Sequence, residues 1–120
     1  MERRIEEALS RDRTVDITTT GARSGGTRRI EIWTWLDDGR VYLTGSPGRR
    51  DWYANLKANP ELLVHVKRGE PIDLPARARP IEDPDERREV FGRLLSSTRY
   101  DFDAWLARSP LVELDFVGTG

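Results

Sequence analysis

The sequence has no cysteine, a single histidine, and only two lysines among its 20 basic residues. Without cysteine, disulfide bonds, thiolate metal sites and cysteine nucleophiles are excluded, and we expect no metal centre. No apolar run approaches the roughly 18 residues that a membrane-spanning helix needs, so we expect no integral membrane segment. The first nine residues are charged and lack the apolar stretch of a secretory signal, which favours a cytoplasmic location.

Length and charge narrow the class of protein. With 120 residues the chain is long enough for one hydrophobic core, so residues 1–120 are expected to form a single domain. The net charge of −1 at pH 7 does not fit a nucleic-acid-coating surface, and we expect no nucleic-acid partner. Acid-free basic stretches occur only locally, in residues 17–30 and 39–50. Their arginines are Arg23, Arg28 and Arg29 in the first, and Arg40, Arg49 and Arg50 in the second.

The most informative stretch is residues 18–29, which read TTTGARSGGTRR. It has the pattern of a strand that turns through glycines into a second strand. Backbone N–H groups in such a turn, together with neighbouring guanidiniums, bind anions, most simply a phosphate. The two basic stretches therefore predict a site for a compact polyanionic ligand. A polar hairpin that only joins two strands is the alternative interpretation.

Side-chain periodicity predicts an α+β domain with about six short, mostly antiparallel strands and flanking short helices. Asp38-Gly39 is a strong signal for a tight hairpin. Asp51 and Asp83 are expected to cap helices, and prolines at both ends of segment 74–81 favour an edge strand. The expected helices lie within 1–12, near 52–58, near 84–97 and near 103–107. The expected strands are 15–20, 29–36, 41–44, 62–67, 74–81 and 111–117, which form a barrel over residues 14–117.

The alternation of side chains along the predicted strand 29–36 places Ile30 and Ile32 on one face and Trp33 and Trp35 on the other. We expect Trp33 to lie near the ligand pocket and Trp35 to be structural. Glu31 shares the tryptophan face and, if buried near the ligand, should pair with Arg29 or with an arginine across the sheet. His65 alternates with valines, which places it on the more polar face of the sheet.

Several segments together resemble the deazaflavin (F420)-dependent nitroreductase and quinone reductase family. They are residues 16–25, 28–29, 39–43, 51–60 and 75–78, and the resemblance covers roughly residues 14–117. It implies a split β-barrel of the flavin-mononucleotide-binding type that binds coenzyme F420. It also implies hydride transfer from the reduced coenzyme to a small electron-poor acceptor such as a quinone or nitroaromatic, with the cofactor carrying out the redox chemistry.

The resemblance also implies the residues of the site. Arg23, Ser24 and Arg28 match the positions that bind the phosphate and tail of the cofactor. Gly45 and Ser46 match the segment that passes the deazaflavin ring, and Trp52 matches the aromatic residue that flanks it. Arg49 and Arg50 would add positive charge. Before the last strand, Tyr100, Phe102 and Trp105 are available to wall the acceptor pocket, and we expect Tyr100 and Trp105, with Trp33 from the strand alternation, to contact the acceptor. Tyr100 is a candidate proton donor, and packing against the barrel is its alternative role.

Two other functions remain open at this point. The same barrel can use flavin mononucleotide (FMN) instead of F420. It can also serve as a non-catalytic carrier or sensor, which is favoured by a shorter loop at residues 45–50 and by fewer tyrosines before the last strand than the family usually has. A homodimer is expected only by analogy with other split barrels.

Overall fold

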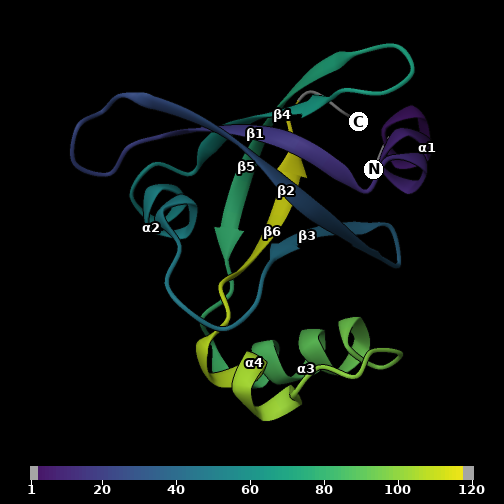
Figure 1. The fold of residues 1–120 in the computed structure, drawn as a ribbon, viewed down its shortest axis with the longest axis vertical. Coiled ribbons are helices and arrows are strands. Elements are labelled where there is room, and N and C mark those ends of the chain that lie inside the picture. Colours follow the sequence, from purple (N-terminus) through teal and green to yellow (C-terminus); the bar gives the residue numbers. More distant parts are fainter. Residues whose placement is uncertain (1–2, 118–120) are drawn as a thin grey trace.

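The structure, a computed structural model, describes residues 3–117. Its centre is a closed antiparallel barrel in which the strands neighbour one another in the order β1-β2-β3-β6-β5-β4 (Figure 1). The strands are β1 (Thr14–Thr20), β2 (Thr27–Asp37), β3 (Arg40–Thr44), β4 (Glu61–Val66), β5 (Ile72–Pro80) and β6 (Leu111–Phe116). The helices are α1 (Arg3–Arg11), α2 (Asp51–Ala58), α3 (Pro84–Leu94) and α4 (Phe102–Arg108). The predicted split-barrel fold class is confirmed.

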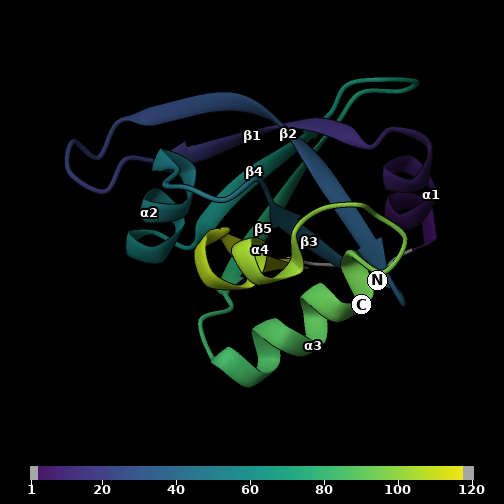
Figure 2. The ribbon, with the colours of Figure 1, turned by 60° about the horizontal axis from the view of Figure 1, so that its bottom comes forward.

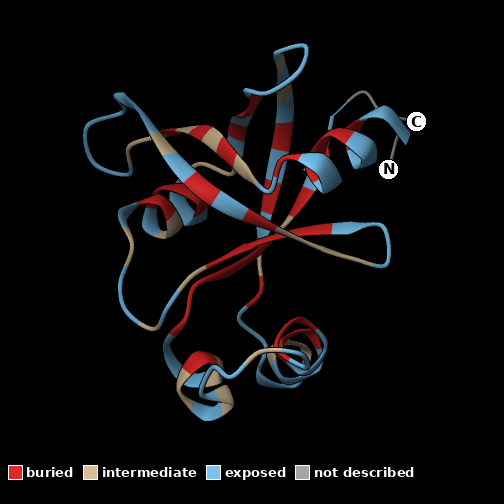
Figure 3. Cartoon of the chain, turned by 45° about the vertical axis from the view of Figure 1, so that its right-hand side comes forward, coloured by how far each residue is buried: buried red, intermediate tan, exposed pale blue. Residues whose placement is uncertain are grey.

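The core lies inside the barrel because apolar side chains alternate along the strands. In β1, Val15 and Ile17 are fully buried while their neighbours are only partly so. Red and paler segments therefore alternate along several strands in Figure 3. Leu56 of α2 and Leu9 of α1 add to the same cluster, so both helices close the barrel from outside.

The β2–β3 connection is the tight hairpin that the sequence predicts. Asp38 and Gly39 both have positive φ angles, of 49° and 73°. Two consecutive left-handed residues are what a two-residue hairpin turn requires. The turn fixes the register of β2 against β3, with Trp35 opposite Tyr42.

Strand β5 is not an edge strand, contrary to the expectation from its prolines. It pairs with β4 through residues 72–77 and with β6 through residues 76–80. The prolines fit because neither interrupts a two-sided stretch of pairing. Pro75 lies just before the β6 pairing begins, and its carbonyl accepts a hydrogen bond from the Val117 N–H at 3.0 Å.

The helix starts agree with the sequence at α3 but not at α2. Asp83 caps α3 by accepting from the Glu86 N–H at 2.9 Å, with Pro84 in the first turn. Asp51 is not the cap of α2. Arg50 occupies that position in an extended conformation, and Asp51 is already helical. Its side chain is directed to Arg28 instead of to the helix backbone.

Helices α3 and α4 form a layer against the outer side of the barrel near β3 and β6 (Figure 2). Tyr42 of β3, Phe91 of α3 and Trp105 of α4 belong to one buried hydrophobic cluster that joins this layer to the barrel. Arg87 joins the two helices. Its guanidinium donates to four backbone carbonyls, those of Ile81, Trp105, Leu106 and Ser109.

The hairpin of β1 and β2 extends beyond β4, the second strand with which β1 pairs. β1 pairs with β2 along its whole length, but its pairing with β4 covers only Asp16, Ile17 and Thr18. Residues 19–28, called the β1–β2 arm below, thus project from the barrel, with α2 beside them (Figure 1).

Candidate functional site

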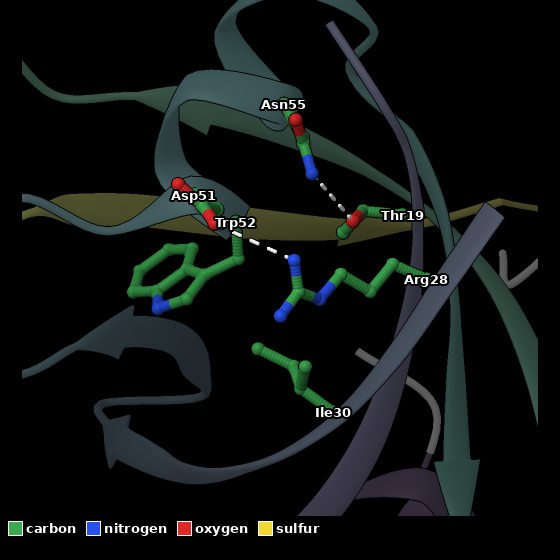
Figure 4. A pocket seen from close by; sticks show the side chains of 6 residues that line it. All are labelled: Thr19, Arg28, Ile30, Asp51, Trp52 and Asn55. Atoms are coloured by element: carbon green, nitrogen blue, oxygen red, sulfur yellow. Dashed lines mark hydrogen bonds and ion pairs between the residues drawn. The ribbon is translucent and has the colours of Figure 1, made fainter. Parts of the chain in front are cut away.

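A cavity of about 190 Å³ lies where the β1–β2 arm meets α2. Figure 4 shows its side chains, with Arg28 extending from β2 toward Asp51 and Trp52. The lining residues are Thr19, Arg28, Ile30, Asp51, Trp52 and Asn55.

Strand register explains which arginine of the arm reaches the cavity. Arg28 lies opposite Thr19 in the β1–β2 ladder and shares the strand face of Ile30. Arg29, one residue on, points to the opposite face. Its Nε donates to the Asp16 carboxylate at 2.9 Å. Of these two adjacent arginines, only Arg28 can contact a ligand in the cavity.

Helix α2 supplies the other wall. Trp52 and Asn55 lie on one face of the helix because they are three residues apart, and both are buried. The Asn55 side chain accepts from the Ala22 N–H at 3.0 Å and donates to Thr19 Oγ1 at 3.3 Å. Asn59, one turn later, donates to the carbonyls of Thr20 and Gly21 at 3.4 and 3.5 Å. Asn55 and Asn59, called the asparagine latch below, hold the β1–β2 arm against α2.

The glycine-rich turn of the arm has a defined internal structure. The Gly21 N–H donates to the Gly26 carbonyl at 2.7 Å, and the Gly26 N–H donates to Ser24 Oγ at 3.1 Å. Gly25 has φ of 72°, which glycine adopts without strain. The Ser24 hydroxyl thus already accepts a bond within the turn. Arg23 is exposed and forms no ion pair with any residue in 3–117.

The cavity contains charges of both signs. Arg28 Nη1 lies 3.5 Å from Asp51 Oδ2, and both side chains are largely exposed. Because the pair is in water, its net stabilisation of the fold is small. The guanidinium therefore stays available to an anion that competes with Asp51.

The second basic loop is braced by one of its own arginines. Arg50 donates to the carbonyls of Ser46 and Arg49 at 2.9 and 3.0 Å, and the Gly48 N–H donates to the Arg108 carbonyl. None of Gly45, Ser46, Arg49 and Arg50 lines the cavity, although the loop leads directly into Asp51. Their assignment to the cofactor stays a prediction.

The aromatic residues assigned to the acceptor lie elsewhere. Trp33 is on the outer face of β2, opposite Thr14, and 60% of its surface is exposed. Tyr100 stacks on Trp105 with ring centroids 4.7 Å apart, and Trp105 is buried under α3. The structure brings none of the three to the cavity. Trp35 is structural, as expected, since it packs edge-on against Trp105.

The outer face of the barrel carries a polar network. His65 is on the polar face, as predicted, but it is buried there between Thr18 Oγ1 and Asp73 Oδ1, each at 2.7 Å. Glu31 pairs with Lys67 and not with Arg29, because Arg29 already forms an ion pair with Asp16. Hydrogen bonds from Lys67 and then Arg29 lower the pKa of Asp16, and those to Glu31 and Asp16 raise the pKa of Lys67.

A larger groove of about 590 Å³ lies between α2 and strands β5 and β6. Its three cationic residues are already paired: Arg77 with Glu61 at 2.6 Å, Arg79 with both Glu86 and Glu113, and Lys57 with Glu82 at 3.9 Å. An anion there would compete with several carboxylates. The smaller cavity at the β1–β2 arm is thus the better candidate for an anionic ligand.

Sequence reasoning overlooked four residues of the cavity. Asp51 was interpreted as a helix cap, and no role was assigned to Thr19, Ile30 or Asn55. Helical spacing from Trp52 would have indicated Asn55, and strand alternation from Arg28 would have indicated Ile30. Within residues 3–117, no group of three or more histidine, aspartate or glutamate residues is arranged to hold a metal ion. In this same part of the chain, no helix has the length and apolarity to cross a bilayer.

Comparison with known proteins identifies relatives of the chain. The model of the family described as F420H(2)-dependent quinone reductase matches residues 3–109. A curated F420H(2)-dependent quinone reductase of Mycobacterium tuberculosis is 36% identical over 77 residues, which are 58% of this chain and 49% of the relative. The chain thus spans about half the length of the curated relatives it matches.

Solved structures share the fold. A structure described as an F420-H2-dependent reductase has a TM-score of 0.55 and 24% identity, covering 87% of this chain and 95% of that one. A putative 5-nitroimidazole antibiotic resistance protein of Bacteroides thetaiotaomicron has a TM-score of 0.74 and 15% identity, covering 98% and 80%. At these identities the likeness concerns the barrel alone.

Proposed function

Because the chain belongs to the F420H(2)-dependent quinone reductase family, we propose that it binds reduced F420 at the β1–β2 arm and reduces a quinone or another electron-poor acceptor. The observation that supports this most directly is the meeting of Arg28 and Trp52 at one cavity. A guanidinium beside an aromatic wall suits a cofactor that combines an anionic group with a flat ring.

The residues present fit one part of such a cofactor. The cavity, at about 190 Å³, is smaller than the roughly 300–1,000 Å³ of a typical small-molecule site. We assign it to the phosphate and the start of the acidic tail, bound by Arg28. Arg23 would contact the tail farther out on the arm. The ring would lie along Trp52 and the segment at Gly45 and Ser46.

When bound, the deazaflavin supplies the hydride, and the chain binds, orients and shields the reacting groups. Trp52 is fixed for this role because it is buried against the core. The asparagine latch holds the arm in place before the ligand arrives, which lowers the entropic cost of binding. Tyr100 stacks on Trp105 away from the cavity, which favours its alternative role of packing against the barrel over that of a proton donor. Replacing it with phenylalanine should therefore change neither turnover nor F420 affinity.

A carrier or sensor function is the second candidate. The position of Trp33, Tyr100 and Trp105 away from the cavity favours it, because no aromatic residue other than Trp52 lines the site. Such a protein would bind F420 but would not oxidise it with any acceptor. An FMN-dependent oxidoreductase would instead be yellow when purified from a host that makes no F420.

Fluorescence titration of the purified protein with F420 and with FMN tests the binding step. Quenching at micromolar F420, with weaker FMN binding, is the expected result. Single-turnover oxidation of reduced F420 by a quinone then separates the reductase from the carrier. Absence of any fluorescence change with F420 would contradict the proposal. The homodimer and the cytoplasmic location stay predictions, which size-exclusion chromatography and cell fractionation address.

A further inference from the structure

Three threonines are buried within residues 3–117, and one of them uses its hydroxyl differently from the other two. Thr34 Oγ1 donates to the Arg13 carbonyl at 3.1 Å, and Thr44 Oγ1 donates to the Pro110 carbonyl at 2.5 Å. Thr19 Oγ1 accepts a hydrogen bond and donates to no group in the described part of the chain. Of the three, only Thr19 lines a described cavity. A buried donor is normally satisfied, so the Thr19 hydrogen is available to a ligand.

The backbone of the β1–β2 arm determines the direction of the hydrogen bond at Thr19. The Ala22 nitrogen, which can only donate, lies 3.0 Å from Asn55 Oδ1. The amide nitrogen of Asn55 is therefore turned to Thr19 Oγ1, at 3.3 Å, and it too can only donate. Because Thr19 must accept this bond, its own hydrogen points elsewhere.

Thr19 is placed to share a ligand with Arg28. The two residues lie directly opposite each other in the β1–β2 ladder, so their side chains emerge on the same face of the sheet. Figure 4 shows the Thr19 hydroxyl between Asn55 and Arg28. Since the cavity measures only about 190 Å³, an oxyanion that enters it and contacts Arg28 also lies against Thr19. The cavity thus combines an exposed, charged donor with a neutral donor that is only 2% exposed.

We propose that Thr19 is a ligand-binding residue whose hydroxyl donates to an oxygen of the anionic group held by Arg28. In the same proposal, Asn55 is a positioning residue, because its amide keeps the Thr19 hydrogen free for the ligand. The inference rests on the proposed function for the identity of the ligand, F420, whose phosphate supplies the accepting oxygen. The asparagine latch then both holds the arm and orients a donor in the cavity.

The first test measures the Kd of F420 by fluorescence titration. Thr19→Val replaces the hydroxyl with a methyl group of similar shape and should raise the Kd about tenfold, the loss expected for one hydrogen bond to a charged group. Thr19→Ser keeps the hydroxyl and should retain most of the affinity. Thr34→Val is the matched control, because it also removes a buried hydroxyl but lies outside the cavity. It should lower stability in urea without changing the Kd.

A second measurement distinguishes a lost donor from a loosened arm. In Thr19→Val, the Asn55 carbonyl oxygen can still accept from the Ala22 N–H, so hydrogen exchange at the Ala22 amide should stay close to that of the wild type. In the Asn55→Ala background, Thr19→Val should have a smaller effect on the Kd than in the wild type, because the hydroxyl is no longer oriented. An undiminished effect there would contradict the positioning role of Asn55.

The inference is overturned if Thr19→Val binds F420 as tightly as the wild type, or if Thr19→Ser loses as much affinity as Thr19→Val. A loss of affinity accompanied by faster Ala22 exchange would also overturn it, since that result indicates a structural role. If the wild type binds no F420, the proposed function fails, and inorganic phosphate becomes the probe, with the chemical shift of the Ala22 amide as the readout. Weaker phosphate binding by Thr19→Val than by the wild type then supports the inference, while equal binding or none overturns it. Thr19→Ala serves as a second variant if Thr19→Val does not fold.

Discussion

The α2 side and the α3–α4 side of the barrel both combine arginine with aromatic residues, but they use them differently. On the α2 side, Arg28 extends into a cavity and contacts one exposed carboxylate. On the other side, Arg87 donates to four backbone carbonyls, beside the buried Trp105. Burial even lowers the pKa of Arg87 from its ordinary value. An arginine is available to a ligand only where the backbone does not already use its donors.

The largest effect on stability should come from removing the arginine that joins α3 and α4. Arg87→Ala leaves several carbonyls without a donor, so we expect a loss of about 3 kcal/mol in the free energy of unfolding. Urea denaturation measures it. Arg88→Ala, at an exposed neighbouring position, should change stability by less than about 0.5 kcal/mol. Similar losses in the two variants would mean that the carbonyl contacts are not responsible.

The converse prediction concerns ligand binding on the α2 side. Arg28→Ala should weaken F420 binding by about 2 kcal/mol if the residue makes a charge-assisted bond to the cofactor. Folding stability should barely change, because its ion pair is exposed. Fluorescence titration and urea denaturation provide the two readouts. Arg29→Ala, on the outer face, is the matched control for binding. Arg23→Ala should have a smaller effect than Arg28→Ala, since Arg23 lies outside the cavity.

The asparagine latch should contribute to both properties. Asn55→Ala removes one acceptor and one donor from a buried position, and we expect a loss of about 1.5 kcal/mol in stability. Hydrogen exchange at the Ala22 amide should accelerate, and F420 affinity should fall as the arm loosens. Asn59→Ala should have a weaker effect, because its two bonds are longer. Unchanged Ala22 exchange in Asn55→Ala would contradict a latch.

A smaller, pH-dependent effect should appear on the outer face. The lowered pKa of Asp16 means that its ionised form is stabilised in the folded state. Its contribution is therefore present above about pH 4 and is lost as the pH falls through the folded-state pKa. Asp16→Asn should lower stability at neutral pH by less than about 1 kcal/mol and flatten the acid limb of the stability curve. An acid limb identical to that of the wild type would exclude Asp16 as a source.

The smallest effect is expected at Trp33. Its side chain is mostly exposed and does not line the cavity. Trp33→Ala should therefore change monomer stability by less than about 0.5 kcal/mol and leave F420 affinity unchanged. Titration and urea denaturation again apply. A strong loss of F420 affinity would restore the role in the site that the sequence indicated.

Local patterns predicted the barrel well because each strand and turn depends on nearby residues. The Asp38-Gly39 hairpin and the Asp83-Pro84 helix start are determined by a few neighbouring positions. The site was harder to predict because its residues come from three elements. Strand alternation predicts that Arg28 lies on the same face of β2 as Ile30. Its pairing with Asp51 depends on how α2 packs against the barrel, which local patterns do not determine. The burial of Trp105 in α4 likewise depends on Tyr42 of β3, which is far away from it along the chain.

The short pairing between β1 and β4 has an evolutionary consequence. Since the arm extends past β4, its length and sequence can change without opening the ring of strands. Three of the four bonds of the asparagine latch go to backbone groups of the arm, which a different side chain at those positions would still present. New ligand preferences can then arise by swapping a hairpin tip, while the rest of the domain keeps its architecture.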